Sequence, residues 1–220
     1  MITVHHLDNS RSQRVLWLLE ELGQDYRVVS YVRDPATRRA PEALRQVHPL
    51  GKAPAVELDG LVLAESGAII EELLDRFDDG RLRPPAGTAA RRAFTYWLHY
   101  AEGSVMPQLL LRVVFDGIET GPLPLLIRPL ARALARGVKR AVVAPQLAMH
   151  LAHMEAAVAP SGWFAGEAFS AADIQMSFAV QAAAALDLLD DYPGLAAWQA
   201  RIESRPAWQR SVARGGPFSL

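Results

Sequence analysis

Residues 48–69, HPLGKAPAVELDGLVLAESGAI, contain the pattern that decides the fold. Two short apolar runs, Ala55–Leu58 and Leu61–Ala64, flank an Asp-Gly pair, and this arrangement predicts a β-hairpin with a two-residue turn. The apolar residues that follow recur at helical spacing, which predicts a helix over Ser66–Phe77. The segment is therefore expected to form a strand–strand–helix unit.

The residues before this unit predict the other half of a small α/β domain. Ile2–Leu7 and Tyr26–Val32 are rich in β-branched residues and predict two strands. Between them, apolar positions recur at helical spacing until Gly23, and Pro41–Val47 predicts a further short helix. The expected order is βαβ followed by αββα, with a right-handed crossover between the first two strands.

The pattern changes after the hairpin unit. Residues 81–87, RLRPPAG, have the composition of a linker, and strand signals end there. Four later segments show helical periodicity: Ala89–Phe115, Leu125–Leu151, Ala171–Leu189 and Leu195–Arg205. We therefore expect an α/β domain at residues 1–80, a linker at 81–87 and an all-helical domain at 88–220.

The composition excludes several classes of protein. The chain is 50% hydrophobic and 21% charged, which is typical of a folded globular protein, and its net charge of −1 gives no general attraction to nucleic acid. It contains no cysteine, which excludes disulfides, thiolate metal sites and cysteine nucleophiles. Because the first residues lack a signal-peptide pattern and no apolar run is long enough to cross a bilayer, we expect a cytoplasmic protein.

Three motifs connect this organisation to a known family. They are HHLDNSRSQRVLWLLEEL at residues 5–22, the segment at 48–69, and SAADI at 170–174. In this order they resemble the cytosolic glutathione transferases, and the late segment DYP at 191–193 with Trp198 is similar to bacterial and fungal members. The resemblance implies a thioredoxin-like first domain that binds glutathione, a helical domain that holds a small hydrophobic electrophile, and a homodimer without a metal cofactor. In SAADI, Ser170 and Asp173 form a capping box with a structural role only.

The chemistry of this family requires a thiolate. A free thiol has a pKa of about 8.5, so lowering it by about two units takes roughly 2.7 kcal/mol of preferential stabilisation of the anion. The family uses Tyr, Ser or Cys in the first loop; here cysteine is absent and the first tyrosine, Tyr26, lies beyond the helix. The resemblance therefore implies Ser10 as the hydroxyl donor, with Ser12 as the second candidate. The alternative is that Ser10 is only a helix N-cap.

The loop before the hairpin is expected to hold the middle and one end of glutathione. The resemblance implies a cis bond before Pro54, which presents the backbone N–H and C=O of Ala53 to the cysteinyl part of the ligand. It also implies an ion pair between Lys52 and the glycine carboxylate. The alternative is that Lys52 is an ordinary solvated loop lysine.

The helix after the hairpin is expected to hold the other end of glutathione. The resemblance implies that Ser66 binds the γ-glutamyl carboxylate at the N-terminus of a helix beginning at Gly67, and that Glu65 accepts from the α-ammonium. The alternative is a plain N-cap at Ser66 with a nearby acid.

Other readings of the function remain open at this stage. The leading one is conjugation of glutathione to an electrophile held against the helix around Tyr96–Phe115. Helical spacing places Tyr100, Met106 and Leu110 near that pocket, but core packing is the preferred interpretation of each. The alternatives are a glutathione-dependent peroxidase, dehalogenase or isomerase, and a non-enzymatic glutathione-binding or scaffold protein.

Two further sets of polar residues are paired histidines and a row of basic residues. Adjacent His5 and His6 on a strand point to opposite faces, and His150 and His153 share a helical face without a nearby acid, so neither pair predicts a metal site. A row of basic residues, Arg128, Arg132, Arg136 and Arg140, recurs every four residues. The row favours a solvated helix face over contact with an anionic membrane or an acidic partner.

Overall fold

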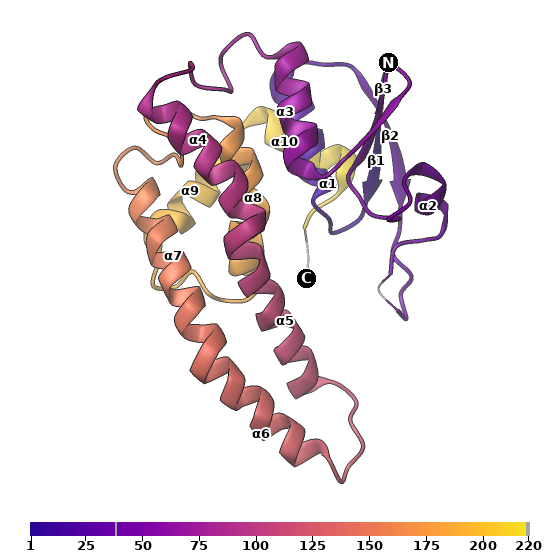
Figure 1. Cartoon of the computed structure of the whole chain (residues 1–220), viewed down its shortest axis with the longest axis vertical. Coiled ribbons are helices and arrows are strands. Elements are labelled where there is room, and N and C mark those ends of the chain that lie inside the picture. Colours follow the sequence, from indigo (N-terminus) through magenta and orange to yellow (C-terminus); the bar gives the residue numbers. More distant parts are fainter. Residues whose placement is uncertain (38, 219–220) are drawn as a thin grey trace.

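The computed structural model describes residues 1–37 and 39–218, so the last two residues of the predicted second domain lie outside the described part. The first part of the chain forms a four-stranded sheet with three helices (Figure 1). Its elements are β1 (Ile2–Leu7), α1 (Ser12–Leu22), β2 (Tyr26–Tyr31), α2 (Ala43–Val47), β3 (Ala55–Leu58), β4 (Leu61–Ala64) and α3 (Ser66–Phe77). The strand order is β2-β1-β3-β4, with only β1 and β2 parallel. This confirms the predicted α/β fold and its order of elements.

The hairpin of β3 and β4 has the predicted two-residue turn. Leu58 pairs with Leu61, and both residues between them have positive φ, 51° at Asp59 and 81° at Gly60. Positive φ at both positions is the type I′ geometry, whose twist matches that of two paired strands. Local turn chemistry therefore determines this edge of the sheet.

Helix α1 packs on both β1 and α3 and forms the centre of the first domain. All residues of β1 are buried, as are Val15 and Leu19 of α1 and Ile70 of α3. The helix ends at the predicted Gly23, whose φ of 66° lets the N–H of Gln24 reach the carbonyl of Leu19 at 3.0 Å. This packing holds the turn between β1 and α1 firmly in place.

The rest of the described chain is helical, as predicted. Its elements are α4 (Ala89–Tyr100), the π-helical turn η1 (Ala101–Val105), α5 (Met106–Thr120), α6 (Arg128–Val138), the π-helical turn η2 (Lys139–Val143), α7 (Ala144–Val158), α8 (Ala171–Ala185), α9 (Pro193–Glu203) and α10 (Pro206–Gly215). Figure 1 shows α4 continuing through η1 into α5, and α6 continuing through η2 into α7, with the α5–α6 hairpin projecting away from the sheet.

Two of the segments with helical periodicity, 89–115 and 125–151, contain the π-helical turns η1 and η2, which the sequence analysis did not predict. A π-helical turn contains an extra residue, and the sequence there keeps the apolar spacing of an ordinary helix. Such turns are frequent at functional sites. In this chain, η1 carries Glu102, which reaches the first domain.

Helix α8 is the central helix of the second domain, and its residues 171–183 are all buried. The capping box predicted at its start is confirmed: Ser170 Oγ accepts from the N–H of Ala172 at 3.3 Å, and Asp173 Oδ2 accepts from the N–H of Ser170 at 2.9 Å. Asp173 also accepts from Trp198 Nε1 at 3.0 Å. The box therefore joins α8 to α9 as well as starting its own helix.

Helix α10 was not predicted from the sequence, because Pro206 resembles the end of the preceding helix. In the structure Pro206 is the first residue of α10, where its missing N–H has no helical partner to lose. The helix packs along α1, with the ring of Trp208 edge-on to that of Trp17 at a centroid distance of 4.8 Å. The chain thus returns to the first domain at its end.

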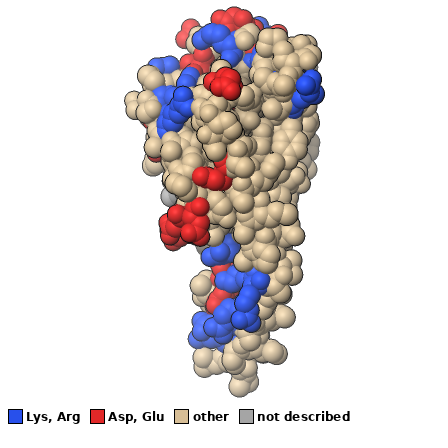
Figure 2. Space-filling model, turned by 90° about the vertical axis from the view of Figure 1, so that its left-hand side faces the viewer, with Lys and Arg blue, Asp and Glu red and all other residues tan. Residues whose placement is uncertain are grey.

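Of the predicted row of basic residues, Arg128, Arg132 and Arg136 lie on α6 and Arg140 lies on η2. Figure 2 shows Lys and Arg side chains gathered on the projecting hairpin. Lys139 pairs with Asp116 and Glu119 of α5, each at 2.5 Å, and Arg132 Nε donates to the carbonyl of Glu119 at 2.9 Å. These contacts fasten α6 to α5. Within the described residues, no helix is both long and apolar enough to cross a membrane.

Candidate functional site

Two adjoining cavities open where the first domain meets the second, the larger beside Phe178 of α8 and the smaller beside Glu102 of η1. The larger has a volume of about 560 Å³ and lies between the β1–α1 turn, α2 and the loop before β3; the smaller, of about 220 Å³, lies between that loop and the start of α3. Four residues line both: Arg11, Leu50, Lys52 and Ala53. Together the cavities form one elongated site of the size expected for a small ligand.

Of the two candidate serines, only Ser10 reaches the larger cavity. It is 7% exposed, and its Oγ lies 2.7 Å from Ser12 Oγ and 3.2 Å from the N–H of Ser12, which donates to it. Ser12 is fully buried behind it, next to His6. Since helix α1 begins at Ser12, Ser10 both satisfies a backbone N–H at the helix start and faces the cavity.

The loop before β3 brings Lys52 and Ala53 to both cavities. The bond between Ala53 and Pro54 is cis, as the family resemblance implied. The Lys52 side chain is exposed, and no ion pair holds it to another residue in the described part of the chain. A flexible ammonium at this point can reach a carboxylate in either cavity.

Glu65 and Ser66 line the smaller cavity, but their roles at the helix differ from the prediction. Helix α3 begins at Ser66, and Glu65 is the N-cap residue, whose carbonyl accepts from the N–H of Ile69 at 2.9 Å. The prediction that Ser66 caps a helix from Gly67 is therefore wrong. The φ of Glu65 is 68°, a conformation that costs a non-glycine residue about 1–3 kcal/mol.

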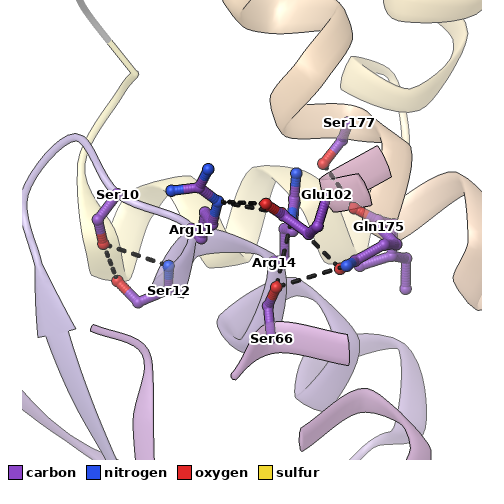
Figure 3. A network of polar contacts seen from close by, with 9 residues as sticks. Ser10, Arg11, Ser12, Arg14, Ser66, Glu102, Gln175 and Ser177 are labelled. Carbon is purple, nitrogen blue, oxygen red and sulfur yellow. Dashed lines mark hydrogen bonds and ion pairs between the residues drawn. The ribbon is translucent and has the colours of Figure 1, made fainter. Parts of the chain in front are cut away.

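The side chain of Ser66 instead joins a buried polar network that sequence reasoning missed (Figure 3). Arg14 Nη1 donates to Ser66 Oγ at 3.3 Å, to Gln175 Oε1 at 3.2 Å and to Glu102 Oε1 at 2.5 Å. Arg11 Nε reaches both oxygens of Glu102, at 3.0 and 2.9 Å. The network thus connects the start of α3 with η1 and α8.

The charges of this network are strongly perturbed. The Arg14 side chain is 1% exposed, and burial lowers its pKa to about 10, so it stays charged at neutral pH. Burial by itself would raise the pKa of Glu102, but the charges of Arg14 and Arg11 outweigh burial and hold that pKa below its ordinary value. Arg14 Nε and Nη2 are buried and have no hydrogen-bond partner among the described residues. The site therefore carries a net positive charge at its inner wall.

The larger cavity is more cationic still. Among the residues that the structure describes, its wall contains five basic side chains and one acidic side chain, Glu42. The basic residues are Arg11, Arg33, Arg39, Arg45 and Lys52. Such a wall favours an anionic ligand, whereas Glu65 in the smaller cavity is suited to an ammonium group. Sequence reasoning identified only Lys52 among these cations, because the arginines come from three places in the chain: the β1–α1 turn, the connection between β2 and α2, and α2 itself.

The residues predicted around the electrophile do not line either cavity. Tyr100 and Met106 are buried in the core, and Leu110 is 61% exposed on α5. Tyr100 hydrogen-bonds to His150, and Tyr96 to His153 Nε2 at 2.9 Å. The aromatic ring that does line the larger cavity is that of Phe178 on α8.

Within the described residues, no cluster of His, Asp and Glu has the make-up of a metal site. His5 bonds to Tyr31 and Glu57, whereas His6 bonds to Ser12 and Gly215. The two histidines thus contact different elements, in keeping with their predicted opposite directions.

Both parts of the chain match known family models. Residues 1–74 match the glutathione S-transferase N-terminal domain, and residues 138–206 match the glutathione S-transferase C-terminal domain. Glutathione S-transferase 3 of Schizosaccharomyces pombe is 34% identical over 209 residues, which span 94% of this chain and 85% of that protein.

Solved structures give the same picture. A glutathione S-transferase from Actinobacillus pleuropneumoniae is 33% identical with a TM-score of 0.78, covering 98% of this chain and 93% of that one. A sphingomonad glutathione S-transferase complexed with glutathione is 25% identical with a TM-score of 0.73, covering 97% and 98% of the two chains. The similarity in sequence and fold therefore extends along nearly the whole chain.

Proposed function

Because the chain belongs to the glutathione S-transferase family and is a glutathione transferase, we propose that it holds glutathione across the two cavities with the sulfur beside Ser10. The observation that carries this proposal is the placement of Ser10, Lys52, Ala53, Glu65 and Ser66 along one elongated site. These residues come from three separate loops. A ligand that touches them all must be extended, as a tripeptide is.

The γ-glutamyl end of glutathione occupies the smaller cavity. Its α-ammonium pairs with Glu65, and its carboxylate lies on Ser66 at the N-terminus of α3, where the free backbone N–H groups and the helix dipole favour an anion. The cysteinyl part pairs with the backbone of Ala53, and the glycine carboxylate binds Lys52 in the cationic larger cavity. Glutathione has two carboxylates and one ammonium, so its charges are complementary to the helix N-terminus, the lysine and the glutamate that line the two cavities.

The sulfur lies at Ser10, where the thiolate accepts a hydrogen bond from the hydroxyl. A hydrogen bond to a charged group contributes about 1.5–3 kcal/mol, which is the amount needed to lower a thiol pKa by one to two units. The thiolate then attacks a small hydrophobic electrophile placed against the ring of Phe178. Since the chain has no cysteine, conjugation is favoured over reactions that need an enzyme–glutathione disulfide.

Domain limits, assembly and location complete the proposal. The glutathione domain comprises residues 1–80 and the electrophile domain residues 88–220, with the linker 81–87 between α3 and α4. Exposed apolar side chains on the α5–α6 hairpin, such as Leu130 and Leu134, support a homodimer, which light scattering after gel filtration can test. The cytoplasm is the proposed location because thiols are kept reduced there.

Calorimetry with glutathione and a conjugation assay with a panel of electrophiles test the proposal. We expect glutathione to bind, and Ser10→Ala to raise the pKa of the bound thiol while leaving affinity for S-methylglutathione intact. Ser204→Ala, at an exposed serine that donates to the carbonyl of Arg201, is the matched control. No binding at millimolar glutathione would instead favour a scaffold protein, and turnover of peroxides or halides alone would favour the peroxidase or dehalogenase alternatives.

A further inference from the structure

A chain of hydrogen bonds runs from the larger cavity to the end of the helical domain. Ser10 Oγ lies 2.7 Å from Ser12 Oγ, and Ser12 Oγ lies 2.8 Å from His6 Nδ1. On the far side of the ring, His6 Nε2 lies 2.8 Å from the carbonyl oxygen of Gly215. The side chains of Ser10, Ser12 and His6 are buried, and among the described residues Ser10 is the only member of the chain at the larger cavity.

The carbonyl of Gly215 determines the direction of every bond in this chain. A carbonyl only accepts, so His6 Nε2 must carry a hydrogen. In a neutral ring Nδ1 then has a free lone pair, which accepts from the hydroxyl of Ser12. The other acceptor within reach of Ser12, the carbonyl of Leu7, is more distant at 3.3 Å.

Consequently, when Ser12 donates to His6 or to the carbonyl of Leu7, Ser10 is the donor in its bond to Ser12. One lone pair of Ser10 accepts from the N–H of Ser12 at 3.2 Å, and the other is left to face the cavity. In this state Ser10 offers an acceptor to a ligand and no donor. It can receive a hydrogen bond from a neutral thiol, but it can stabilise a thiolate only if its hydrogen turns outward.

We propose that Ser10, Ser12 and His6 form a relay that carries the thiol proton of glutathione to His6 Nδ1. This inference rests on the proposed position of the sulfur at Ser10. The S–H bond breaks as its proton passes to Ser10 Oγ, the Ser10 hydrogen passes to Ser12, and the Ser12 hydrogen passes to His6. The products are a thiolate that accepts from Ser10 and an imidazolium that donates to Ser12 and Gly215. No external base takes part.

The surroundings of His6 suit a reversible proton acceptor. Burial lowers the pKa of His6, which keeps the ring neutral at rest, while the bond to Gly215 and the charge of Asp8 favour the protonated form. Gly215 is the last residue of α10, so its carbonyl belongs to the negative end of that helix. A third cavity, separate from the two of the candidate site, lies beside His6 and Ser10. Within the described chain, its other lining residues are uncharged.

Glycine is required at position 215 for this contact. A Cβ there would lie 3.0 Å from His6 Cε1 and 2.7 Å from Leu16 Cδ1, and would also clash with Gln13. Only a residue without a side chain lets the helix end approach the ring closely enough. The tertiary contact between α10 and β1 therefore decides which His6 nitrogen faces the serines.

A proton count on the wild-type protein tests the relay directly. Glutathione is titrated by calorimetry at about pH 7 in two buffers of different ionisation enthalpy, with ultraviolet absorbance reporting the thiolate and S-methylglutathione as the baseline. We expect a thiolate signal with almost no proton released to the buffer, because the negative charge of the bound thiolate favours the protonated form of His6, which then keeps the proton. A thiolate signal accompanied by release of one proton per bound glutathione would overturn the relay.

Two histidine variants separate the relay from a structural role. His6→Asn keeps a polar group facing Ser12 but cannot take a proton. We expect the pKa of the bound thiol to rise toward about 8.5. At about pH 6.5, kcat/KM should then fall about tenfold for each unit of that rise, and it should recover at high pH, where the thiol ionises without help. Affinity for S-methylglutathione should not change. His5→Asn, on the same strand but bonded to Glu57, is the matched control and should keep the wild-type pH profile.

The outcomes distinguish the relay from the proposed function. If Ser10→Ala shifts the thiol pKa and His6→Asn does not, the relay is wrong and the role of Ser10 stands. If neither variant shifts it, the sulfur does not lie at Ser10 and both proposals fail. A His6→Asn variant that loses activity equally at all pH values would also refute the relay.

Discussion

Replacing Glu102 by Gln removes the one negative charge that neutralises the buried Arg14. The two side chains meet at 2.5 Å, and Arg14 is 1% exposed, so its charge cannot be hydrated when the partner becomes neutral. After the change, all acceptors of Arg14 are neutral: Ser66, Gln175 and the new amide oxygen at position 102. The variant therefore removes the ion pairs of Glu102 with Arg14 and Arg11, which join the two domains.

The magnitude follows from the geometry. At an effective dielectric constant of about 20, two charges about 4 Å apart attract by about 4 kcal/mol. Glu102 is 33% exposed, which reduces this value through solvent screening, and Gln still accepts one hydrogen bond. We expect Glu102→Gln to lower the free energy of unfolding by about 2–3 kcal/mol, and the melting temperature by about 5–10 °C for a chain of this length.

Urea unfolding at neutral pH measures the effect, with Glu72→Gln as the matched control. Glu72 pairs with Arg76 at 2.6 Å on the surface of α3, so its replacement should lower the free energy of unfolding by less than about 1 kcal/mol. Adding Arg14→Met to Glu102→Gln should recover stability, because no unpaired charge remains buried. Equal losses for Glu102→Gln and Glu72→Gln would refute the reasoning.

The same pair predicts a pH dependence. The folded protein holds the pKa of Glu102 below the ordinary value of 4.5, so the pair's contribution is fully present above that pH and is lost as the pH falls through the folded value. The difference in unfolding free energy between the wild type and Glu102→Gln should therefore shrink in acid. If that difference instead grows below pH 4.5, the charges of Arg14 and Arg11 do not outweigh the effect of burial on the pKa of Glu102.

Three further changes test other parts of the molecule. Asp173→Ala leaves three buried N–H donors without an acceptor, so it should lower the free energy of unfolding in urea by about 3–5 kcal/mol. Ser170→Ala should lower it by about 1 kcal/mol, and equal losses for the two variants would count against the hydrogen-bond argument. Lys52→Met should weaken glutathione binding about tenfold by calorimetry, whereas Arg140→Met, on the projecting hairpin, should not change it. Glu65→Gly should relieve the backbone strain at this position and stabilise the fold by about 1 kcal/mol, while it weakens glutathione binding. A variant less stable than the wild type would show that no strain is stored at Glu65.

The architecture of the first domain could be predicted because its signals are local. Three strands and one helix have the bounds expected from the sequence: Ile2–Leu7, Ala55–Leu58, Leu61–Ala64 and Ser66–Phe77. The turn at Asp59 depends on backbone preferences of two adjacent residues, and strand and helix periods depend on neighbours a few positions away. Such information does not depend on the rest of the fold.

The errors have a common cause. The prediction for Ser66 missed that Glu65 adopts a positive φ, because nothing in the residue type indicates it. The end of the helical domain was missed because Pro206 is equally suited to stop one helix and to start another. In each case, contacts with distant parts of the chain select between two locally acceptable conformations.

By itself, the sequence determined the order of strands and helices in the first domain, the capping box at Ser170, and the residue types available near the sulfur. Only the tertiary structure decided which of them meet. It joined Arg14 to Glu102 across 88 positions and brought the carbonyl of Gly215 to His6 across 209. Electrostatic and hydrogen-bond energies depend on distance in space, and a linear pattern does not contain that distance until the helices have packed.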